Sequence, residues 1–163
     1  VAILAPALAL LQNKHFGGHI DPGQAVLLAL YHDATEILTG DLPTPIKYYN
    51  PALRASYKEV EETAANRLLE LLPEELRADY APYLLHPDPE LEAVVKAADK
   101  LDAYLKCVKE RKAGNGEFQT AQAQIWDALQ ANPLPALGYF IEHYLPSFEL
   151  TLDELNGSTH TMF

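Results

Sequence analysis

The sequence has little cysteine and little positive charge. A single cysteine, Cys107, among 163 residues excludes an intrachain disulfide, which fits a reducing compartment. Lysine and arginine number 12 against 23 aspartates and glutamates, so the formal net charge is −11. Nucleic-acid polymers and anionic membrane surfaces attract basic patches, and this composition therefore argues against both as partners.

Long hydrophobic runs are also missing. The apolar opening VAILAPALALLQ is shorter than the roughly 20 residues that span a bilayer, and it lacks the basic start of a secretory signal. We therefore expect a cytoplasmic protein. The apolar content of 48% and the length of 163 residues suit one globular domain with a sizeable core.

Helical patterning runs through almost the whole chain, and no sustained strand alternation interrupts it. Asp21, Asn50 and Asp88 each precede a proline, which is typical of the start of a helix. We expect a single all-α domain over residues 1–163, with a frayed polar tail at 151–163. The predicted helices cover residues 1–14, 22–38, 51–72, 73–84, 89–113, 117–132 and 135–145.

The most informative segment is LLALYHDATEILTGDLPTPIKYY, residues 27–49, an apolar helix that carries three ionisable side chains. His32, Asp33 and Glu36 share one side of this helix, so their side chains can converge. The opposite side collects the apolar residues. At about 100° per residue, the stripe that we expect to face the core consists of Val26, Leu27, Leu30, Tyr31, Ile37 and Leu38.

Two alanines, Ala25 and Ala29, accompany the polar residues, which indicates that another element packs closely on that side. Buried ionisable groups are costly unless they are paired or bind a metal, and imidazole with carboxylates suits a divalent cation. The alternative is that His32 is a core histidine bonded to a carbonyl, and that Asp33 and Glu36 are surface charges. The spacing alone favours this alternative, because adjacent His-Asp is a common dipeptide.

Longer motifs favour the metal site. The segments YHDATEILTGDLPTPIKYY, KAADKLDAYLKC and LPSF resemble the HD-domain phosphohydrolases, and within them the bacterial YfbR-like 5′-deoxynucleotidases. The likeness runs over most of the chain, and the block from HD to TPIK is its most specific part. The resemblance implies an HD-domain helical bundle, a divalent metal such as cobalt or manganese, and a homodimer.

Matched residue by residue, the resemblance makes His32 and Asp33 metal ligands and Asp99 the distal metal ligand. Glu36 would be the catalytic carboxylate that positions or activates the attacking water. A rigid loop after the helix would line the nucleotide, and a side chain placed against C2′ would exclude a 2′-hydroxyl. The residues of this loop that would bind substrate are Asp41, Leu42, Pro43 and Thr44.

Periodicity by itself does not support Asp99. The same helix face holds Glu92, Lys96 and Lys106, which is typical of a solvated surface, and Asp102 is an equally acidic neighbour one turn further on. The resemblance of KAAD to the family motif is what places the ligand at Asp99.

The family pattern also includes a histidine ligand on an earlier helix and an Arg-Trp pair further upstream. His32 lies too close to Val1 for these to be present, and we therefore expect that natural N-terminal residues are missing. His15 and His19 flank FGG, match nothing in the pattern, and are expected in a loop.

The leading hypothesis is a metal-dependent 5′-deoxynucleotidase that converts deoxyribonucleoside 5′-monophosphates to a deoxynucleoside and phosphate. One alternative is another HD-type activity, such as a phosphodiesterase, a triphosphohydrolase or a di-iron oxygenase. A second alternative, of a different class, is a metal-free HD-like module that binds a nucleotide or a partner and performs no reaction.

Overall fold

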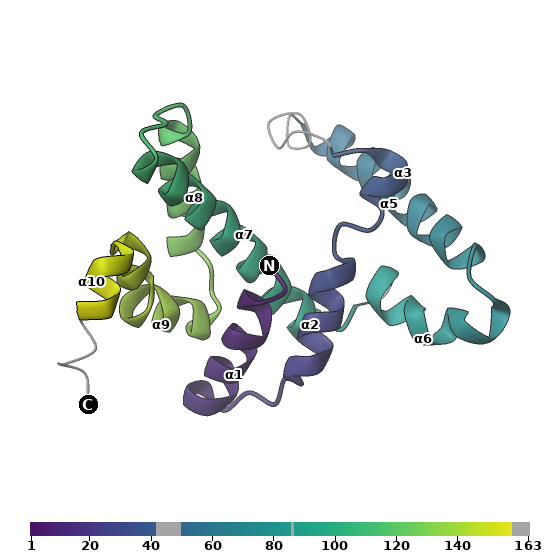
Figure 1. The fold of residues 1–163 in the computed structure, drawn as a ribbon. Helices are drawn as coiled ribbons and strands as arrows, with labels where there is room; N and C mark the ends of the chain where they lie inside the picture. The colour runs from purple at the N-terminus through teal and green to yellow at the C-terminus, as the bar shows by residue number, and fades with distance from the viewer. Residues whose placement is uncertain (42–49, 86, 158–163) are drawn as a thin grey trace.

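The computed structural model describes residues 1–41, 50–85 and 87–157, and within these ranges the regular structure is helical, with no strand. The all-α class predicted from the sequence is confirmed. No helix in these ranges combines the length and the apolar character needed to cross a membrane. Figure 1 shows α1 (Leu4–Phe16), α2 (Pro22–Tyr31), α3 (Glu36–Thr39), α5 (Pro51–Glu70), α6 (Glu74–Leu84), α7 (Pro89–Lys112), α8 (Gln119–Gln130), α9 (Pro135–His143), the 3₁₀ helix η1 (Leu145–Glu149) and α10 (Leu152–Gly157).

Polar caps start the helices where the sequence predicts them. The Oδ1 atom of Asp21 accepts hydrogen bonds from the amides of Gly23 and Gln24, at 2.7 and 3.2 Å. Asn50 caps α5 and Asp88 caps α7 in the same way. These side chains satisfy amides that have no partner inside the helix, so they fix where each helix begins.

The helix predicted over residues 22–38 is interrupted. α2 ends at Tyr31, residues 32–35 form turns, and α3 begins at Glu36. The amide of Ala34 bonds to the carbonyl of Tyr31 at 3.0 Å, a three-residue spacing that tightens the chain relative to an α-helix. The His-Asp pair therefore lies at a discontinuity, in a segment that we call the HD turn (residues 32–35).

The core stripe predicted for this segment is wrong in four of its members. The exposed fractions are 38% for Leu27, 62% for Leu30, 79% for Ile37 and 50% for Leu38. The buried face of α2 instead consists of Ala25, Leu28 and Ala29, and α2 packs against α1 and α7. The close packing predicted from the two alanines is confirmed, because their small side chains let neighbouring helices approach.

The main core lies where α1, α2, α7, α8 and α9 meet (Figure 1). α1 contacts α2, α7 and α9, and α7 contacts α1, α2, α8 and η1, so these two helices form the centre of this group. Alanines are frequent among the buried side chains. The core residues include Ala5, Leu8, Ala9, Ala25, Leu28, Ala29, Val94, Val95, Ala97, Ala98, Leu101, Leu129, Leu137 and Phe140.

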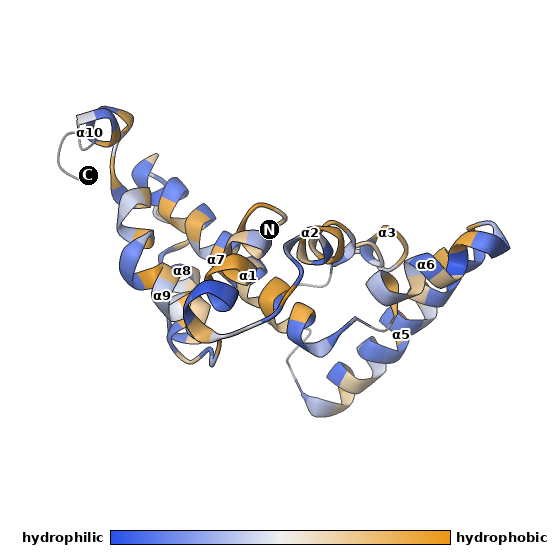
Figure 2. Ribbon diagram, turned by 90° about the horizontal axis from the view of Figure 1, so that it is seen from below, coloured by the Kyte–Doolittle hydropathy of each residue, from blue (hydrophilic) through white to orange (hydrophobic). Residues whose placement is uncertain are grey.

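A second group, which we call the arm, consists of α3, α5 and α6. α5 packs against both α3 and α6, and α6 returns to pack against α2. Figure 1 shows the arm extending to one side of the main core. Figure 2 shows α5 coloured largely as hydrophilic and α2 largely as hydrophobic, in line with the three buried residues among the 20 of α5 and the three among the 10 of α2.

The C-terminal segment differs from the expected frayed tail. Leu152–Gly157 forms the short helix α10, and residues 158–163 lie outside the described ranges. The amide and the hydroxyl of Thr151 both donate hydrogen bonds to the carboxylate of Glu154, at 2.7 and 2.9 Å. These bonds stabilise the first turn of α10 and lower the pKa of Glu154.

The buried and exposed leucines predict opposite effects of the same substitution. Leu101→Ala opens a cavity in the core, where Leu101 is 0% exposed, and we expect it to lower the free energy of unfolding by about 2–5 kcal/mol. Leu30→Ala, at a side chain that is 62% exposed, should change the free energy of unfolding by less than about 0.5 kcal/mol. Urea unfolding followed by circular dichroism measures both values. Equal losses for the two variants would mean that Leu30 is buried after all.

Candidate metal and substrate site

His32 is held by the end of α2. Its Nδ1 atom lies 2.8 Å from the carbonyl oxygen of Ala29, and the side chain is only 22% exposed. Because a carbonyl oxygen can only accept, the Nδ1 atom must carry the hydrogen of this bond. In the neutral imidazole, the Nε2 atom then presents its lone pair.

Two carboxylates surround that lone pair. The Nε2 atom of His32 lies 3.0 Å from Oδ2 of Asp33 and 3.7 Å from Oδ1 of Asp99. Nevertheless, Nε2 is buried and has no hydrogen-bond partner with suitable geometry among the described residues. Packing between α2 and α7 brings Asp99 to this position from a helix that begins more than 50 residues after the HD turn.

The electrostatics of this cluster favour a positive charge at its centre. Interaction with the Asp99 carboxylate raises the pKa of His32, against the opposing effect of burial, and Asp33 adds to the rise. The imidazole in turn lowers the pKa of Asp99. A lone pair that faces two carboxylates is unfavourable unless a proton or a cation lies between them.

The donor atoms fit a divalent cation. A neutral imidazole whose other nitrogen donates to a backbone carbonyl is the usual form of a metal-binding histidine, and carboxylate oxygens complete such sites. Within the described part of the chain, no three His, Cys, Asp or Glu side chains are grouped closely enough to hold a metal on their own. His32, Asp33 and Asp99 therefore offer donor atoms rather than a finished coordination shell.

Glu36 and Asp41 follow the HD turn along the chain. Glu36 is half-buried at the start of α3, and its backbone oxygen accepts a hydrogen bond from the amide of Gly40 at 2.9 Å. Gly40 has a φ of +71°, a conformation that favours glycine, and it turns the chain into the exposed Asp41. The other three predicted substrate residues, Leu42, Pro43 and Thr44, lie outside the described residues.

The two interpretations of the His-Asp pair can be compared with this geometry. His32 does bond to a carbonyl, as the structural alternative predicts, and Asp33 is 58% exposed. That alternative does not predict Asp99, which the resemblance alone located and which lies beside His32. Asp102, one turn further on, pairs instead with Lys106 at 3.0 Å.

His15 lies in the last turn of α1 rather than in a loop, whereas His19 lies in the connection to α2 as predicted. The ring of His15 stacks on Tyr139 of α9, with ring centroids 4.5 Å apart. Both histidines are exposed. The contact with α9 gives His15 a structural role.

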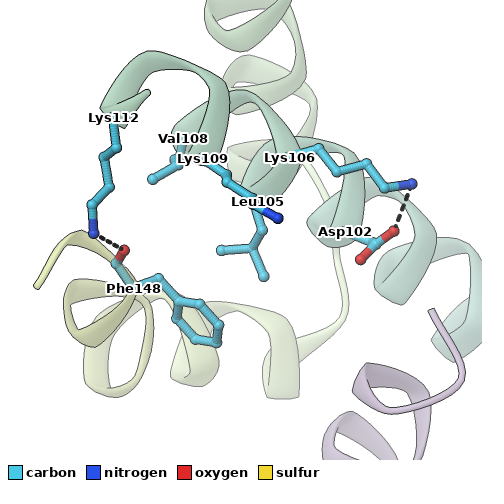
Figure 3. Close-up of a pocket in the computed structure, with 7 residues that line it drawn as sticks. All are labelled: Asp102, Leu105, Lys106, Val108, Lys109, Lys112 and Phe148. Atoms are coloured by element: carbon cyan, nitrogen blue, oxygen red, sulfur yellow. Dashed lines mark hydrogen bonds and ion pairs between the residues drawn. The ribbon is translucent and has the colours of Figure 1, made fainter. Parts of the chain in front are cut away.

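Two cavities lie outside the cluster around His32. One of about 380 Å³ lies between α7 and η1 (Figure 3), and its lining includes Leu105, Lys109 and Phe148. Two of its lysines are already engaged, since Lys106 pairs with Asp102, and Lys112 donates to backbone carbonyls of the C-terminal segment. The other, of about 570 Å³, is an open groove between α3 and α5. Neither is lined by His32, Asp33, Glu36 or Asp99.

The fold and the cluster define a class of protein. An HD-domain phosphohydrolase from Listeria innocua has a similar crystal structure, with a TM-score of 0.74 over 90% of this chain and 72% of that chain. The two sequences are 22% identical, so this comparison concerns the fold. The helical bundle is that of an HD-domain phosphohydrolase.

Sequence comparison narrows this class to a family. Residues 1–148 match the model of the YfbR-like 5′-deoxynucleotidases. The 5′-deoxynucleotidases of Vibrio cholerae and Shewanella oneidensis are 49% and 48% identical to this chain over 158 residues, which is 96% of this chain and 81% of each relative. The chain therefore belongs to the YfbR-like 5′-deoxynucleotidase family, as its motifs predicted.

The bond from His32 to Ala29 predicts an unusual tautomer. At a pH where the ring is neutral and metal has been removed by a chelator, we expect the proton on Nδ1 and a bare Nε2, because the carbonyl can only accept. Nitrogen-15 NMR of the imidazole distinguishes the two forms. The exposed His143 provides the reference for a ring without such a bond. A proton on Nε2 of His32 would contradict the geometry described above.

Proposed function

We propose that this chain is a metal-dependent 5′-deoxynucleotidase, which hydrolyses deoxyribonucleoside 5′-monophosphates to a deoxynucleoside and inorganic phosphate. One observation carries the proposal. In a member of the YfbR-like family, the HD turn and α7 bring His32, Asp33 and Asp99 around one imidazole nitrogen. These are donor atoms of the kind that hold catalytic metals.

His32 would bind the cation through Nε2, and Asp33 and Asp99 would bind it through carboxylate oxygens. When bound, the metal supplies Lewis acidity and a fixed point for a phosphate oxygen. The cation is also required electrostatically, because two carboxylates in a chain of net charge −11 repel a phosphate unless their charge is neutralised. This donor set accepts several divalent metals, and manganese and cobalt are the first to test.

We assign to Glu36 the transfer of a proton from the attacking water. Its carboxylate would accept a proton from the attacking water while the water oxygen forms a bond to phosphorus. The bond between phosphorus and the 5′-oxygen breaks on the opposite side, and the leaving deoxynucleoside takes up a proton. Such a transition state needs mainly positioning and charge stabilisation, and a carboxylate next to the HD turn fits that requirement.

The choice of sugar is assigned to the loop that begins at Asp41. A side chain held against C2′ would clash with the 2′-hydroxyl of a ribonucleotide. A 2′-deoxy sugar lacks this hydroxyl and leaves room for the side chain. The positive φ of Gly40 favours one direction for the chain at the start of this loop. The hydroxyl of Tyr57 donates a hydrogen bond of 3.3 Å to the carbonyl oxygen of Gly40. Weak contacts to the base would let several deoxynucleotides react.

The small nucleotide is the proposed partner of this site. The homodimer implied by the family resemblance stays a prediction, which sedimentation analysis can test. The acidic composition continues to argue against a nucleic-acid polymer as substrate.

Phosphate release from a panel of nucleotides tests the proposed function. With added manganese or cobalt, we expect release from deoxyribonucleoside 5′-monophosphates, and a kcat/KM that is about 100-fold lower for the matching ribonucleotides. A chelator should abolish the reaction. Binding of nucleotides without release, under any metal, would instead favour the non-catalytic HD-like module. Release from cyclic nucleotides or triphosphates would favour one of the other HD-type activities.

Two substitutions separate metal binding from proton transfer. We expect Asp99→Asn to weaken metal binding by about 100-fold, because it converts an anionic ligand into a neutral amide. Glu36→Gln should leave metal binding intact and lower kcat by about 10²–10⁴-fold, because the proton acceptor is lost. Calorimetry with manganese and phosphate release measure the two effects.

Asp102→Asn is the matched control for Asp99→Asn. It makes the same chemical change on the same helix one turn away, and it weakens the ion pairs of Asp102 with the exposed Lys106 at 3.0 Å and with the amine of Val1 at 3.8 Å. We expect it to change metal affinity and kcat by no more than about twofold. If Asp102→Asn weakens metal binding and Asp99→Asn does not, the distal ligand has been assigned to the wrong aspartate. Normal turnover by Glu36→Gln would contradict its role.

A further inference from the structure

Three tyrosines join α2 to α6. The ring of Tyr31, the last residue of α2, stacks with Tyr83 at a centroid distance of 6.1 Å and meets the edge of Tyr80 at 5.7 Å. The hydroxyl of Tyr83 donates a hydrogen bond of 2.7 Å to the side-chain oxygen of Gln24, which also lies on α2. We call Gln24, Tyr31, Tyr80 and Tyr83 the tyrosine clasp.

The clasp closes a loop of the chain. The arm leaves α2 through the HD turn, runs through α3, α5 and α6, and returns to α2 at the clasp. The contact between α6 and α2 is the principal packing contact between the arm and the main core among the described residues. Figure 1 shows α6 running back toward α2, against which it packs. The clasp therefore determines the direction in which the arm leaves the core.

A second hydrogen bond links α5 to the end of α3. The hydroxyl of Tyr57 on α5 donates to the carbonyl of Gly40 directly after α3, at 3.3 Å, and α3 packs along α5. α3 is only four residues long and contains no buried residue, so it cannot fix its own position. The amide of Glu36, the first residue of α3, donates to the carbonyl of Asp33 at 3.0 Å, and the direction of α3 beyond this bond is set by α5, which packs against α6 and, through α6, against the clasp.

The proposed metal ligands are held differently. His32 bonds to Ala29 within α2, and Asp99 lies on α7, which packs directly against α2 in the main core. The positions of His32 and Asp99 therefore depend on α2 and α7 rather than on α3, α5 or α6. The clasp and the metal ligands can therefore be perturbed separately.

We propose that the tyrosine clasp is a positioning device that places Glu36 against the metal ligands, and that its loss lowers turnover without lowering metal affinity. The inference rests on the proposed function, because it assigns Glu36 a catalytic role. None of the clasp residues needs to touch the nucleotide or the metal. Their contribution is to keep α3 in one arrangement relative to the HD turn.

Tyr83→Phe and Gln24→Leu test the clasp in the full chain. Each removes the hydrogen bond of 2.7 Å and keeps a side chain of similar size. We expect each to lower kcat about fivefold, which corresponds to the loss of one hydrogen bond, with manganese affinity unchanged. The double variant should be no slower than either single variant, because both substitutions remove the same bond. Gln24→Glu, which keeps an acceptor oxygen, should restore most of the activity.

Hydrogen exchange provides a readout that does not depend on turnover. In Tyr83→Phe we expect faster deuterium uptake by the amides of residues 32–41, while the helices of the main core stay unchanged. Tyr139→Phe is the matched control, since it deletes a tyrosine hydroxyl from α9, in a ring stack with His15 remote from the clasp. It should change neither deuterium uptake at 32–41 nor kcat.

The outcomes separate the clasp from the proposed function. Faster exchange at 32–41 with lower kcat and unchanged manganese affinity supports the proposal. Unchanged exchange, additive losses in the double variant, or equal losses of kcat and metal affinity overturns it. If the wild-type chain releases no phosphate from any nucleotide, the proposed function fails. In that case the exchange data alone decide whether the clasp positions α3: faster exchange at 32–41 supports it, and unchanged exchange overturns it.

Discussion

The close approach of α2 and α7 is the constraint on which the site depends. Alanines on both helices, including Ala29 and Ala98, are almost completely buried and leave little side-chain volume between the two backbones. This contact brings His32 to Asp99, although a chain segment of more than 50 residues separates them. A larger side chain at these positions would push the helices apart, and the imidazole nitrogen would lose one of its two carboxylates.

The electrostatic character of the site follows from that approach. An imidazole that donates from Nδ1 to its own helix must present Nε2 to whatever lies opposite, and here two carboxylates lie opposite. The cluster is stabilised when a positive charge occupies its centre, either as a proton on His32 or as a metal ion. In the proposed function this arrangement would have a chemical use that a core histidine lacks, because a bound cation would also hold a phosphate.

The arm meets a different requirement from the main core. It buries few side chains, and it carries Glu36 and Asp41 on short segments next to the HD turn. In the proposed function, His32 and Asp99 would bind metal from the tightly packed α2 and α7, whereas Glu36 would transfer a proton from a lightly packed segment, so binding and chemistry would be divided between two structural units. Such a division lets a small contact, such as a single tyrosine hydroxyl, influence one function without the other.

The sequence by itself determined the helical class, the starts of α2, α5 and α7, and the family. Caps such as Asp21 and Asp88 act on adjacent amides, and the HD-to-TPIK block is contiguous, so both can be recognised without a partner. Only the tertiary structure decided which face of α2 is buried and which helix contact brings Asp99, already singled out by the family motif, beside His32. A helical wheel ranks residues by hydrophobicity, whereas burial depends on which helix packs opposite, and here alanines rather than Leu30 allowed α7 to approach.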